Sequence, residues 1–196
     1  MIGIVDYGLG NLFSLQNTLN YLQCEHKLVK KPEECSDCDK LILPGVGAFP
    51  EAVRKLRGNS MWSVLKSWEK PLLGICLGMQ LLFTSSEEFE YTEGLNLIPG
   101  RVVKLTGEVK IPHIGWNSLT WTSRNQLADG LSDGDYVYFV HSYHAVIPEE
   151  YLVAFTDYGG PVTAIAAKGN TIGTQFHPEK SGQTGLKILQ NFIDIK

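Results

Sequence analysis

The sequence predicts an α/β fold with an open, mostly parallel twisted central sheet, helices on both faces of that sheet, and a smaller β-rich region. In the first half of the chain, short apolar runs alternate with amphipathic helical patterns, and strands that are each followed by a helix imply parallel pairing in a sheet covered on both faces. From about Gly94 the pattern changes to short β-like runs separated by Gly, Pro, Asn and Asp.

The elements of the first half follow from the spacing of apolar residues. Ile2–Val5 is an apolar run that predicts a strand, and four leucines after it recur at spacings of three and four, which is typical of one helix face. Further strands are expected at 41–43 and 71–75. Further helices are expected around 52–56, 61–68 and 77–83.

In the second half, β-like runs are expected at 101–105, 116–121, 136–140, 152–156 and 171–175. A helix with apolar residues between Leu186 and Ile193 follows them. The sequence contains no internal repeat, linker or low-complexity segment, and 196 residues suffice for one sizeable core. We therefore expect residues 1–196 to form a single domain.

Composition excludes several classes of protein. The 17 basic and 21 acidic residues give a net charge of -4, without the Lys/Arg-rich run that binding to nucleic acid favours. No apolar run reaches the roughly 20 residues that span a bilayer, and the chain starts with a strand pattern instead of a basic leader. We expect a soluble, cytoplasmic protein. Its four cysteines are too sparse for a disulfide scaffold, so we expect reduced thiols.

Gly74-Ile75-Cys76-Leu77-Gly78 has the G-x-C-x-G arrangement, the thiol counterpart of the nucleophile elbow that exposes a serine at a sharp strand-to-helix turn. Glycines two residues on either side let the strand and the helix approach without a Cβ clash. A helix N-terminus also stabilises a thiolate, the nucleophilic form of cysteine. Taken alone, Cys76 is equally compatible with a structural role in the core.

His177-Pro178-Glu179 follows a predicted strand and provides the partners that a cysteine nucleophile needs. Sites in open α/β sheets gather just past the ends of strands. A histidine base and a carboxylate that orients it activate such a nucleophile, since the base accepts the thiol proton and later protonates the departing amine. An isolated His-Pro-Glu would more often be a turn with a solvated carboxylate, but together with the elbow it predicts a catalytic triad.

Acyl transfer also needs hydrogen-bond donors for the oxyanion of its tetrahedral intermediate. Pro44-Gly45-Val46-Gly47 ends a predicted strand, and its glycines leave the backbone amides of Val46 and Gly47 free to turn inward or outward. The amide of Leu77, directly after the nucleophile, would be the second donor. The alternative is an ordinary strand-to-helix loop.

These motifs and several other blocks strongly resemble the class I, or triad-type, glutamine amidotransferases, and among them the glutaminase subunits of imidazole glycerol phosphate synthase. The blocks lie at residues 6–12, 44–49, 74–82, 112–117, 138–143 and 173–181. The resemblance implies a flavodoxin-like fold and a γ-glutamyl thioester at Cys76, with His177 as acid and base and Glu179 orienting it. It also implies that L-glutamine is held by Gly45, Gly47, Gln80, Ser142 and Tyr143.

A partner is implied as well. In this family a (β/α)8-barrel cyclase subunit forms a heterodimer with the glutaminase and uses the released ammonia for histidine biosynthesis. From their positions beside the family motifs, Asn11, Trp116 and Lys180 are interface candidates, although Lys180 is also compatible with a solvated surface lysine. Because a glutaminase without its acceptor would waste glutamine, we hypothesise that Val46-Gly47 rests with its amide turned away and reorients when the loaded partner docks.

Two other patterns are set aside, and two other functions stay open. Gly8-Leu9-Gly10 lacks the third glycine of a dinucleotide fingerprint, and Cys35 and Cys38 have no second pair to complete a zinc site. We therefore expect neither a cofactor nor a metal. The open alternatives are a paralogous glutaminase that supplies another acceptor, such as a surface amino-sugar precursor, and an inactive interaction subunit of the same fold.

Overall fold

The computed structural model describes all residues, Met1–Lys196. The helices are α1 (Leu12–Tyr21), α2 (Phe49–Gly58), α3 (Met61–Lys66), α4 (Leu77–Leu81) and α5 (Gly182–Asp194), with short 3-10 helices η1 (Pro32–Cys35), η2 (Gln126–Ala128), η3 (Glu149–Tyr151) and η4 (Pro178–Lys180). The strands are β1 (Ile2–Val5), β2 (His26–Val29), β3 (Lys40–Gly45), β4 (Leu72–Cys76), β5 (Ser85–Ser86), β6 (Thr92–Glu93), β7 (Arg101–Lys104), β8 (His113–Ser118), β9 (Thr120–Trp121), β10 (Tyr136–His141), β11 (Tyr143–Val146), β12 (Leu152–Asp157), β13 (Pro161–Lys168) and β14 (Thr171–Thr174).

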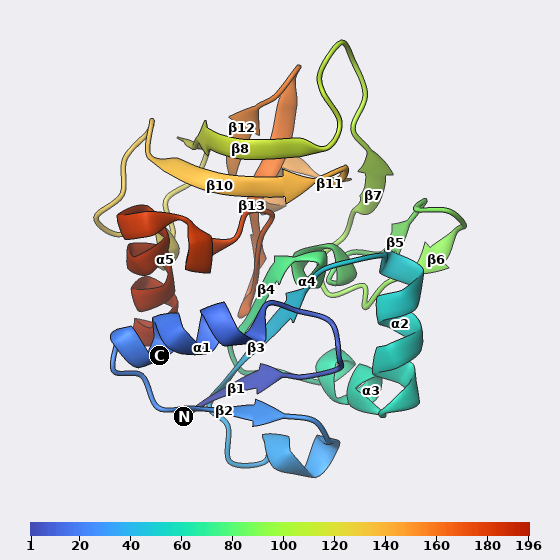
Figure 1. Cartoon of the computed structure of the whole chain (residues 1–196), viewed down its shortest axis with the longest axis vertical. Helices are drawn as coiled ribbons and strands as arrows, with labels where there is room; N and C mark the ends of the chain where they lie inside the picture. Colours follow the sequence, from blue (N-terminus) through green and yellow to red (C-terminus); the bar gives the residue numbers. More distant parts are fainter.

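An eight-stranded central sheet has the order β2-β1-β3-β4-β14-β13-β12-β9 (Figure 1). The five strands from β2 to β14 are parallel to their neighbours, and β13, β12 and β9 pair antiparallel. This is the mostly parallel sheet that the alternation of strands and helices predicts. The register aligns Gly45 of β3 with Cys76 of β4, so the two predicted functional loops leave the sheet side by side.

Helices cover both faces of this sheet, because successive residues of its strands point to opposite sides. Leu41 and Leu43 of β3 belong to a buried cluster with the apolar residues of α2, α3 and α4. Ile42, between them, belongs to a second cluster with those of α1 and α5. In Figure 1, α1 and α5 accordingly lie on one side of the sheet and α2 and α3 on the other.

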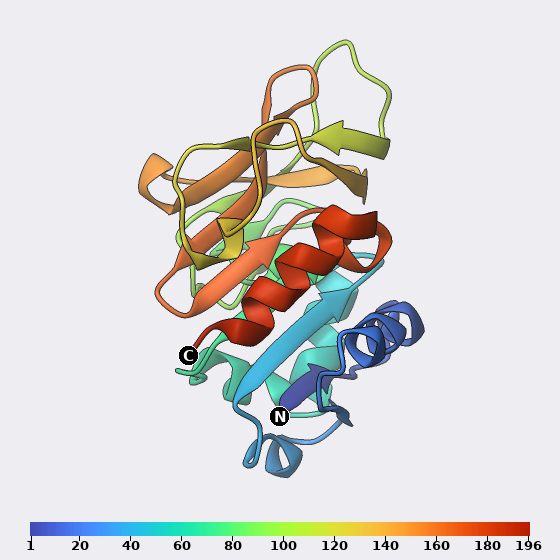
Figure 2. The ribbon, with the colours of Figure 1, turned by 90° about the vertical axis from the view of Figure 1, so that its left-hand side faces the viewer.

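The smaller β-rich region comprises a two-stranded antiparallel pair, β8–β10, and a four-stranded sheet in the order β11-β7-β5-β6. Figure 1 shows β8 and β10 above the end where β4 runs into α4, with β5 and β6 to the side, next to the start of α2, and Figure 2 shows the same upper strands from the side. The β8–β10 pair thereby covers the turn at Cys76, whose sulfur contacts the backbone oxygen of Val140 in β10.

Most of the predicted elements are confirmed, but the sequence patterns missed β2, β11, β13 and the two-residue strands β5 and β6. The most consequential omission is β13, in which Val162–Ala166 is buried without a break. Its alanines and threonine are poor markers of a strand, and a strand buried on both faces shows no polar alternation. The helix expected at 77–83 ends two residues earlier, at Leu81. None of the helices combines the length and the hydrophobicity needed to cross a membrane.

Candidate active site

Cys76 occupies a strained turn between β4 and α4. Its backbone has φ 55° and ψ -110°, a conformation that residues with a side chain rarely adopt and that costs of order 1–3 kcal/mol. The surrounding packing holds this conformation, since β4 is buried along its whole length between β3 and β14. Such strain is characteristic of a nucleophile elbow.

The glycines on either side of Cys76 have the role that the sequence predicts. A Cβ on Gly78 would lie 1.7 Å from the backbone oxygen of Leu43, and a Cβ on Gly74 would lie 2.7 Å from the backbone oxygen of Gly78. Both contacts are far inside the van der Waals limit and involve backbone atoms, which cannot rotate away. Only glycine therefore lets the start of α4 pack against β3 and β4.

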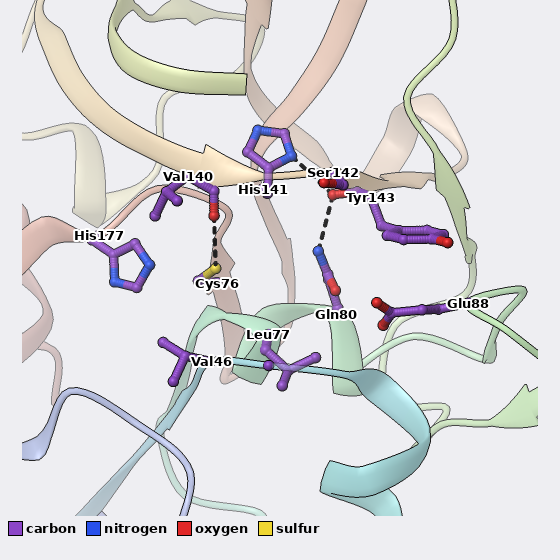
Figure 3. Close-up of a pocket in the computed structure, with 11 residues that line it drawn as sticks. Val46, Cys76, Leu77, Gln80, Glu88, Val140, His141, Ser142, Tyr143 and His177 are labelled. Carbon is purple, nitrogen blue, oxygen red and sulfur yellow. Dashed lines mark hydrogen bonds between the residues drawn. The ribbon is translucent and has the colours of Figure 1, made fainter. Parts of the chain in front are cut away.

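His177 and Glu179 form a buried pair. The Nδ1 atom of His177 donates a hydrogen bond to Oε1 of Glu179 at 2.8 Å, and the two side chains are 2% and 3% exposed. Because Nδ1 carries the proton in this bond, Nε2 of the neutral imidazole is left as an acceptor. This Nε2 atom has no hydrogen-bond partner, and its ring lies beside Cys76 (Figure 3).

Two opposing effects act on the charge of His177. Burial alone would lower the pKa of the imidazole, but the neighbouring Cys76 sulfur and the Glu179 carboxylate outweigh burial and raise the pKa well above its usual range. The site therefore favours a proton on the imidazole when the sulfur is ionised. That charge distribution is the one a cysteine nucleophile needs.

Ser181 fixes the backbone that carries His177. Its Oγ atom donates to the backbone oxygen of His177 at 2.6 Å and accepts the backbone amide of Tyr138 at 2.9 Å. The amide of His177 also donates to the Tyr138 oxygen at 3.0 Å. The loop that bears the imidazole is thereby attached to β10. Sequence reasoning did not single out Ser181, although it closes the His177-containing block.

A cavity of about 240 Å³ lies between these groups, and at roughly 30 Å³ for each water it holds about eight waters, the size of one amino acid. It is lined by Val46, Gly47, Cys76, Leu77, Gln80, Glu88, Val140, His141, Ser142, Tyr143 and His177 (Figure 3). A thiol, an imidazole with a free nitrogen and a buried carboxylate can together carry out acyl transfer.

The family model described as Glutamine amidotransferase class-I matches residues 3–195. The chain belongs to this family. It is 50% identical to the imidazole glycerol phosphate synthase subunit HisH of Bacillus cereus strain G9842, over all of this chain and 95% of that protein. It is 47% identical to the protein of the same name from Bacillus cytotoxicus, with the same coverage.

Two solved structures have the same fold as this amidotransferase. One, described as a glutamine amidotransferase, has a TM-score of 0.76 and 18% identity, and the match covers 97% of this chain and 98% of that chain. The other, PurLQS from Thermotoga maritima, has a TM-score of 0.74 and 19% identity, with 98% and 97% covered. At these identities the likeness concerns the fold alone.

Val46, Gly47 and Leu77, the predicted oxyanion donors of this amidotransferase, all line the cavity. Gly47 has φ +101°, and a Cβ there would meet nothing within 4 Å, so backbone conformation and not space requires glycine. Gly45 is not among the residues that line the cavity, and its role in substrate binding stays a prediction. It is buried in β3, where a Cβ would lie 2.6 Å from the hydroxyl of Tyr7 and 2.9 Å from the amide of Gly78.

Gln80, Ser142 and Tyr143, the other predicted substrate residues, line the cavity together with Gly47. Sequence reasoning missed Glu88, whose carboxylate enters the same space. It accepts the backbone amide of Phe49 at 2.7 Å, and burial raises the pKa of this carboxyl. Nothing in the local sequence distinguishes Glu88 from the exposed Glu87 beside it.

A histidine pair supports the far wall of the cavity. His113 Nδ1 lies 3.1 Å from His141 Nε2, and His141 Nδ1 donates to the Tyr143 oxygen at 2.9 Å. Since the Tyr143 carbonyl can only accept, Nδ1 of His141 carries the proton and Nε2 of this neutral ring is an acceptor. Nδ1 of His113 must therefore be protonated to donate to it. His113 also stacks between Phe139 and Tyr158, with ring centroids 4.7 Å and 3.7 Å away. The sequence offered no reason to treat these two histidines as a pair.

The three interface candidates lie on connected elements near this site. Trp116 on β8 is 54% exposed and packs edge-on against Tyr138 of β10. Lys180 is exposed at the end of η4, which contacts both β10 and α1, and Asn11 precedes α1 without capping it by a side-chain hydrogen bond. The predicted residues therefore come from adjoining elements.

Proposed function

We propose that this protein is the cytoplasmic glutaminase subunit of an imidazole glycerol phosphate synthase, and that residues 1–196 act as one domain. In this proposal it hydrolyses L-glutamine to glutamate and ammonia, and the ammonia passes to a cyclase subunit for histidine biosynthesis. The observation that carries the chemistry is the convergence of the Cys76 elbow and the His177–Glu179 pair on one cavity of amino-acid size. The relatives named above support the choice of synthase.

The first half of the reaction forms a thioester. His177 Nε2 takes the proton of the Cys76 thiol, and the resulting thiolate attacks the side-chain carboxamide carbon of glutamine. The tetrahedral oxyanion accepts hydrogen bonds from the backbone amides at Val46–Gly47 and Leu77. The imidazolium then protonates the departing nitrogen and the carbon–nitrogen bond breaks. Ammonia is released, and the glutamyl group remains bound to Cys76 as a γ-glutamyl thioester. Glu179 keeps Nδ1 protonated and the ring oriented.

The second half regenerates the thiol. His177, now neutral, takes a proton from water as the water oxygen attacks the thioester carbon. A second tetrahedral intermediate uses the same oxyanion donors. Its carbon–sulfur bond breaks, the sulfur regains its proton from His177, and glutamate leaves the cavity. The sum is glutamine plus water giving glutamate plus ammonia.

The amino acid end of glutamine binds at the end of the cavity opposite His177. Glu88 supplies the only carboxylate among the lining residues, and a partly buried carboxylate suits the substrate ammonium group. Gly47, Gln80, Ser142 and Tyr143 complete the set that we propose holds the amino acid end. Burial, together with the nearby Glu88 charge, raises the pKa of the Tyr143 hydroxyl, which keeps it protonated as a hydrogen-bond donor.

For the partner we propose the outer face of the β8–β10 pair, together with Asn11 and Lys180. Ile114 and Trp116 lie two residues apart on the same face of β8 and are 58% and 54% exposed. Tyr136 of β10, paired opposite Ser118, is 58% exposed. An exposed apolar face beside the active site is typical of a protein interface. We propose a (β/α)8-barrel cyclase as its partner, in a heterodimer.

The deciding experiment measures glutamine hydrolysis and imidazole glycerol phosphate formation by this protein mixed with the cyclase of the same organism. Cys76→Ala is expected to abolish hydrolysis while still binding the cyclase, and added ammonium salt should restore product formation. Hydrolysis that survives in Cys76→Ala would refute the mechanism. Failure to complement a histidine auxotroph, with hydrolysis intact, would instead favour a paralogue that supplies another acceptor.

The same assay tests the oxyanion loop. If Val46–Gly47 reorients when the loaded partner docks, glutaminase activity should rise when the cyclase and its acceptor ligand are added together. Full activity of the isolated subunit would contradict that hypothesis.

A further inference from the structure

Gln175 bridges the substrate cavity and the nucleophile without lining the cavity itself. It directly follows β14, and it is completely buried. Its Oε1 atom accepts a hydrogen bond from Gln80 Nε2 at 3.1 Å, and its Nε2 atom donates to the Cys76 sulfur at 3.8 Å. One amide thus connects a residue of the cavity wall to the sulfur.

The orientation of this amide follows from its neighbours. The backbone oxygen of Tyr143 can only accept hydrogen bonds, and it faces Gln80 Nε2 at 3.0 Å. That contact makes the Gln80 atom an NH2 group, which must in turn face the oxygen of Gln175. The NH2 group of Gln175 is therefore directed at the sulfur. A reversed Gln175 amide would bring two donors together at Gln80 and direct an oxygen at Cys76.

The other polar contact of the sulfur has the opposite electrostatic effect. The thiol of Cys76 donates to the backbone oxygen of Val140 at 3.9 Å (Figure 3). A carbonyl oxygen accepts from a thiol but repels a thiolate, whereas an amide NH2 group stabilises the thiolate. The donor from Gln175 thus offsets the unfavourable contact with Val140 when the sulfur ionises.

We propose that Gln175 is a positioning residue that stabilises the thiolate of Cys76 and that Gln80 sets its orientation, which couples the glutamine-binding wall to the nucleophile. Substrate that hydrogen-bonds to Gln80 then acts on the sulfur through the buried amide. This inference rests on the proposed function, in which Cys76 is the nucleophile, but it concerns the ionisation of the sulfur and not the identity of the acceptor.

The test follows alkylation of Cys76 by iodoacetamide in the full chain, without glutamine, from about pH 5 to about pH 10, since only the thiolate reacts. Mass spectrometry of the peptide that contains Cys76 separates its reaction from that of the other cysteines. Gln175→Met keeps the length of the side chain and removes both hydrogen bonds. A hydrogen bond to a charged group corresponds to about one to two pH units, so the pH midpoint of alkylation should rise by that amount.

Thr174→Val provides the matched control. Thr174 is buried next to Gln175 and donates to the Phe176 oxygen at 3.3 Å, away from the sulfur. Its replacement should leave the midpoint unchanged. Gln80→Met tests the coupling while Gln175 is intact. Because this change removes the donor that orients the Gln175 amide, the pH midpoint of alkylation should rise, but by less than in Gln175→Met. If Gln175→Met does not fold, a midpoint of wild-type value in Gln80→Met overturns the proposal.

Turnover gives a second readout that a purely structural role would not produce. Near pH 7, Gln175→Met should lower kcat for glutamine hydrolysis by about 10- to 100-fold with KM little changed, and the deficit should shrink as the pH rises. Equal midpoints in wild type, Gln175→Met and Thr174→Val would overturn the proposal while Cys76-dependent hydrolysis stands. Hydrolysis that persists in Cys76→Ala would instead remove the proposed function itself.

Discussion

The Nδ1 atom of His177 lies 2.8 Å from the Oε1 atom of Glu179, with both side chains nearly excluded from solvent. The remaining polar atoms of the pair, Nε2 of His177 and Oε2 of Glu179, have no hydrogen-bond partner. Buried polar atoms without partners are uncommon and call for a physical reason. For His177 the reason is its role as a base, because Nε2 must stay free to exchange a proton with the sulfur and the substrate.

Glu179→Gln should therefore leave the protein folded but lower kcat for glutamine hydrolysis by about 100- to 10,000-fold, because a neutral amide neither stabilises an imidazolium nor imposes the Nδ1 tautomer. Steady-state ammonia release measures the effect. Glu149→Gln, at an exposed position in η3, serves as the control and should retain full activity. Near-normal turnover in Glu179→Gln would show that His177 needs no carboxylate.

Gly78→Ala should destabilise the protein by about 3 kcal/mol or more, or prevent folding, because the new Cβ would lie 1.7 Å from the Leu43 oxygen. Gly58→Ala is the matched control: it ends α2, its φ is not positive, and a Cβ there would meet nothing within 4 Å. Urea unfolding of both variants checks the contrast. Equal stabilities would mean that α4 can move away from β3 at little cost.

Ser181→Ala should remove the hydrogen bond from the Tyr138 amide that attaches the His177 loop to β10, and the hydrogen bond from the Ser181 hydroxyl to the His177 oxygen within that loop. Loss of a buried hydroxyl that leaves partners unsatisfied costs about 1–3 kcal/mol, and a less constrained imidazole should also lower kcat. Ser36→Ala is the comparison, because the Ser36 hydroxyl donates to the Glu33 oxygen at an exposed site. A Ser181→Ala variant with unchanged stability and unchanged kcat would contradict this account.

The free energy of unfolding should fall when the pH drops from about 7 to about 5. Burial lowers the pKa of His141 to about 3 and that of His113 to about 4, so the unfolded chain binds protons that the native pair does not. Stability from such groups is complete above the unfolded pKa and is lost as the pH falls below it. At about pH 5 the solution is about one and a half pH units below the unfolded pKa of about 6.5. For His141 alone, this difference should lower the free energy of unfolding by about 2 kcal/mol.

His177 acts in the opposite sense, because its raised pKa contributes stability that is lost as the pH rises. His113→Phe isolates the acid effect: a phenyl ring can take its place between Phe139 and Tyr158 but does not titrate. Urea unfolding at both pH values should show a smaller acid loss in this variant. The same loss in both proteins would exclude His113 as a cause.

Glu88→Gln should raise KM for glutamine by about 10- to 100-fold with a smaller effect on kcat, since a charged hydrogen bond to the substrate ammonium is worth about 1.5–3 kcal/mol. Its neighbour Glu87 provides the control, because its carboxylate faces Arg101 at 3.9 Å on the surface and does not line the cavity. Glu87→Gln should behave as wild type. Unchanged KM in Glu88→Gln would remove this carboxylate from substrate recognition.

Local sequence was sufficient for much of the fold. The leucine spacing that predicts α1 and the apolar runs that become β1, β3 and β4 are direct consequences of burial on one helix face or inside a parallel sheet. The limit of that reasoning is β13, whose identity as a strand depends on its two neighbours, β12 and β14, more than on its own alanine-rich composition.

In the candidate site, too, some residues can be predicted from the local sequence and others cannot. Gly-x-Cys-x-Gly and His-Pro-Glu are visible in the sequence because a tight turn and an oriented base need particular residues at fixed short spacings. Glu88 and Gln175 are not visible in that way: each matters only because of side chains that lie far from it along the chain, such as Tyr143 or Cys76. Gly45 shows that packing can also require a glycine of such a motif, since a Cβ there would lie 2.6 Å from the Tyr7 hydroxyl and 2.9 Å from the Gly78 amide.

By itself, the sequence determined the class of fold, the sharp turn at Cys76 and the pairing of a base with a carboxylate, because each depends on residues close together in the chain. Only the tertiary structure decided which side chains surround the sulfur, which carboxylate enters the cavity and which histidines are buried in contact. Those properties depend on distances between segments separated by up to a hundred residues, and packing of the whole sheet sets such distances.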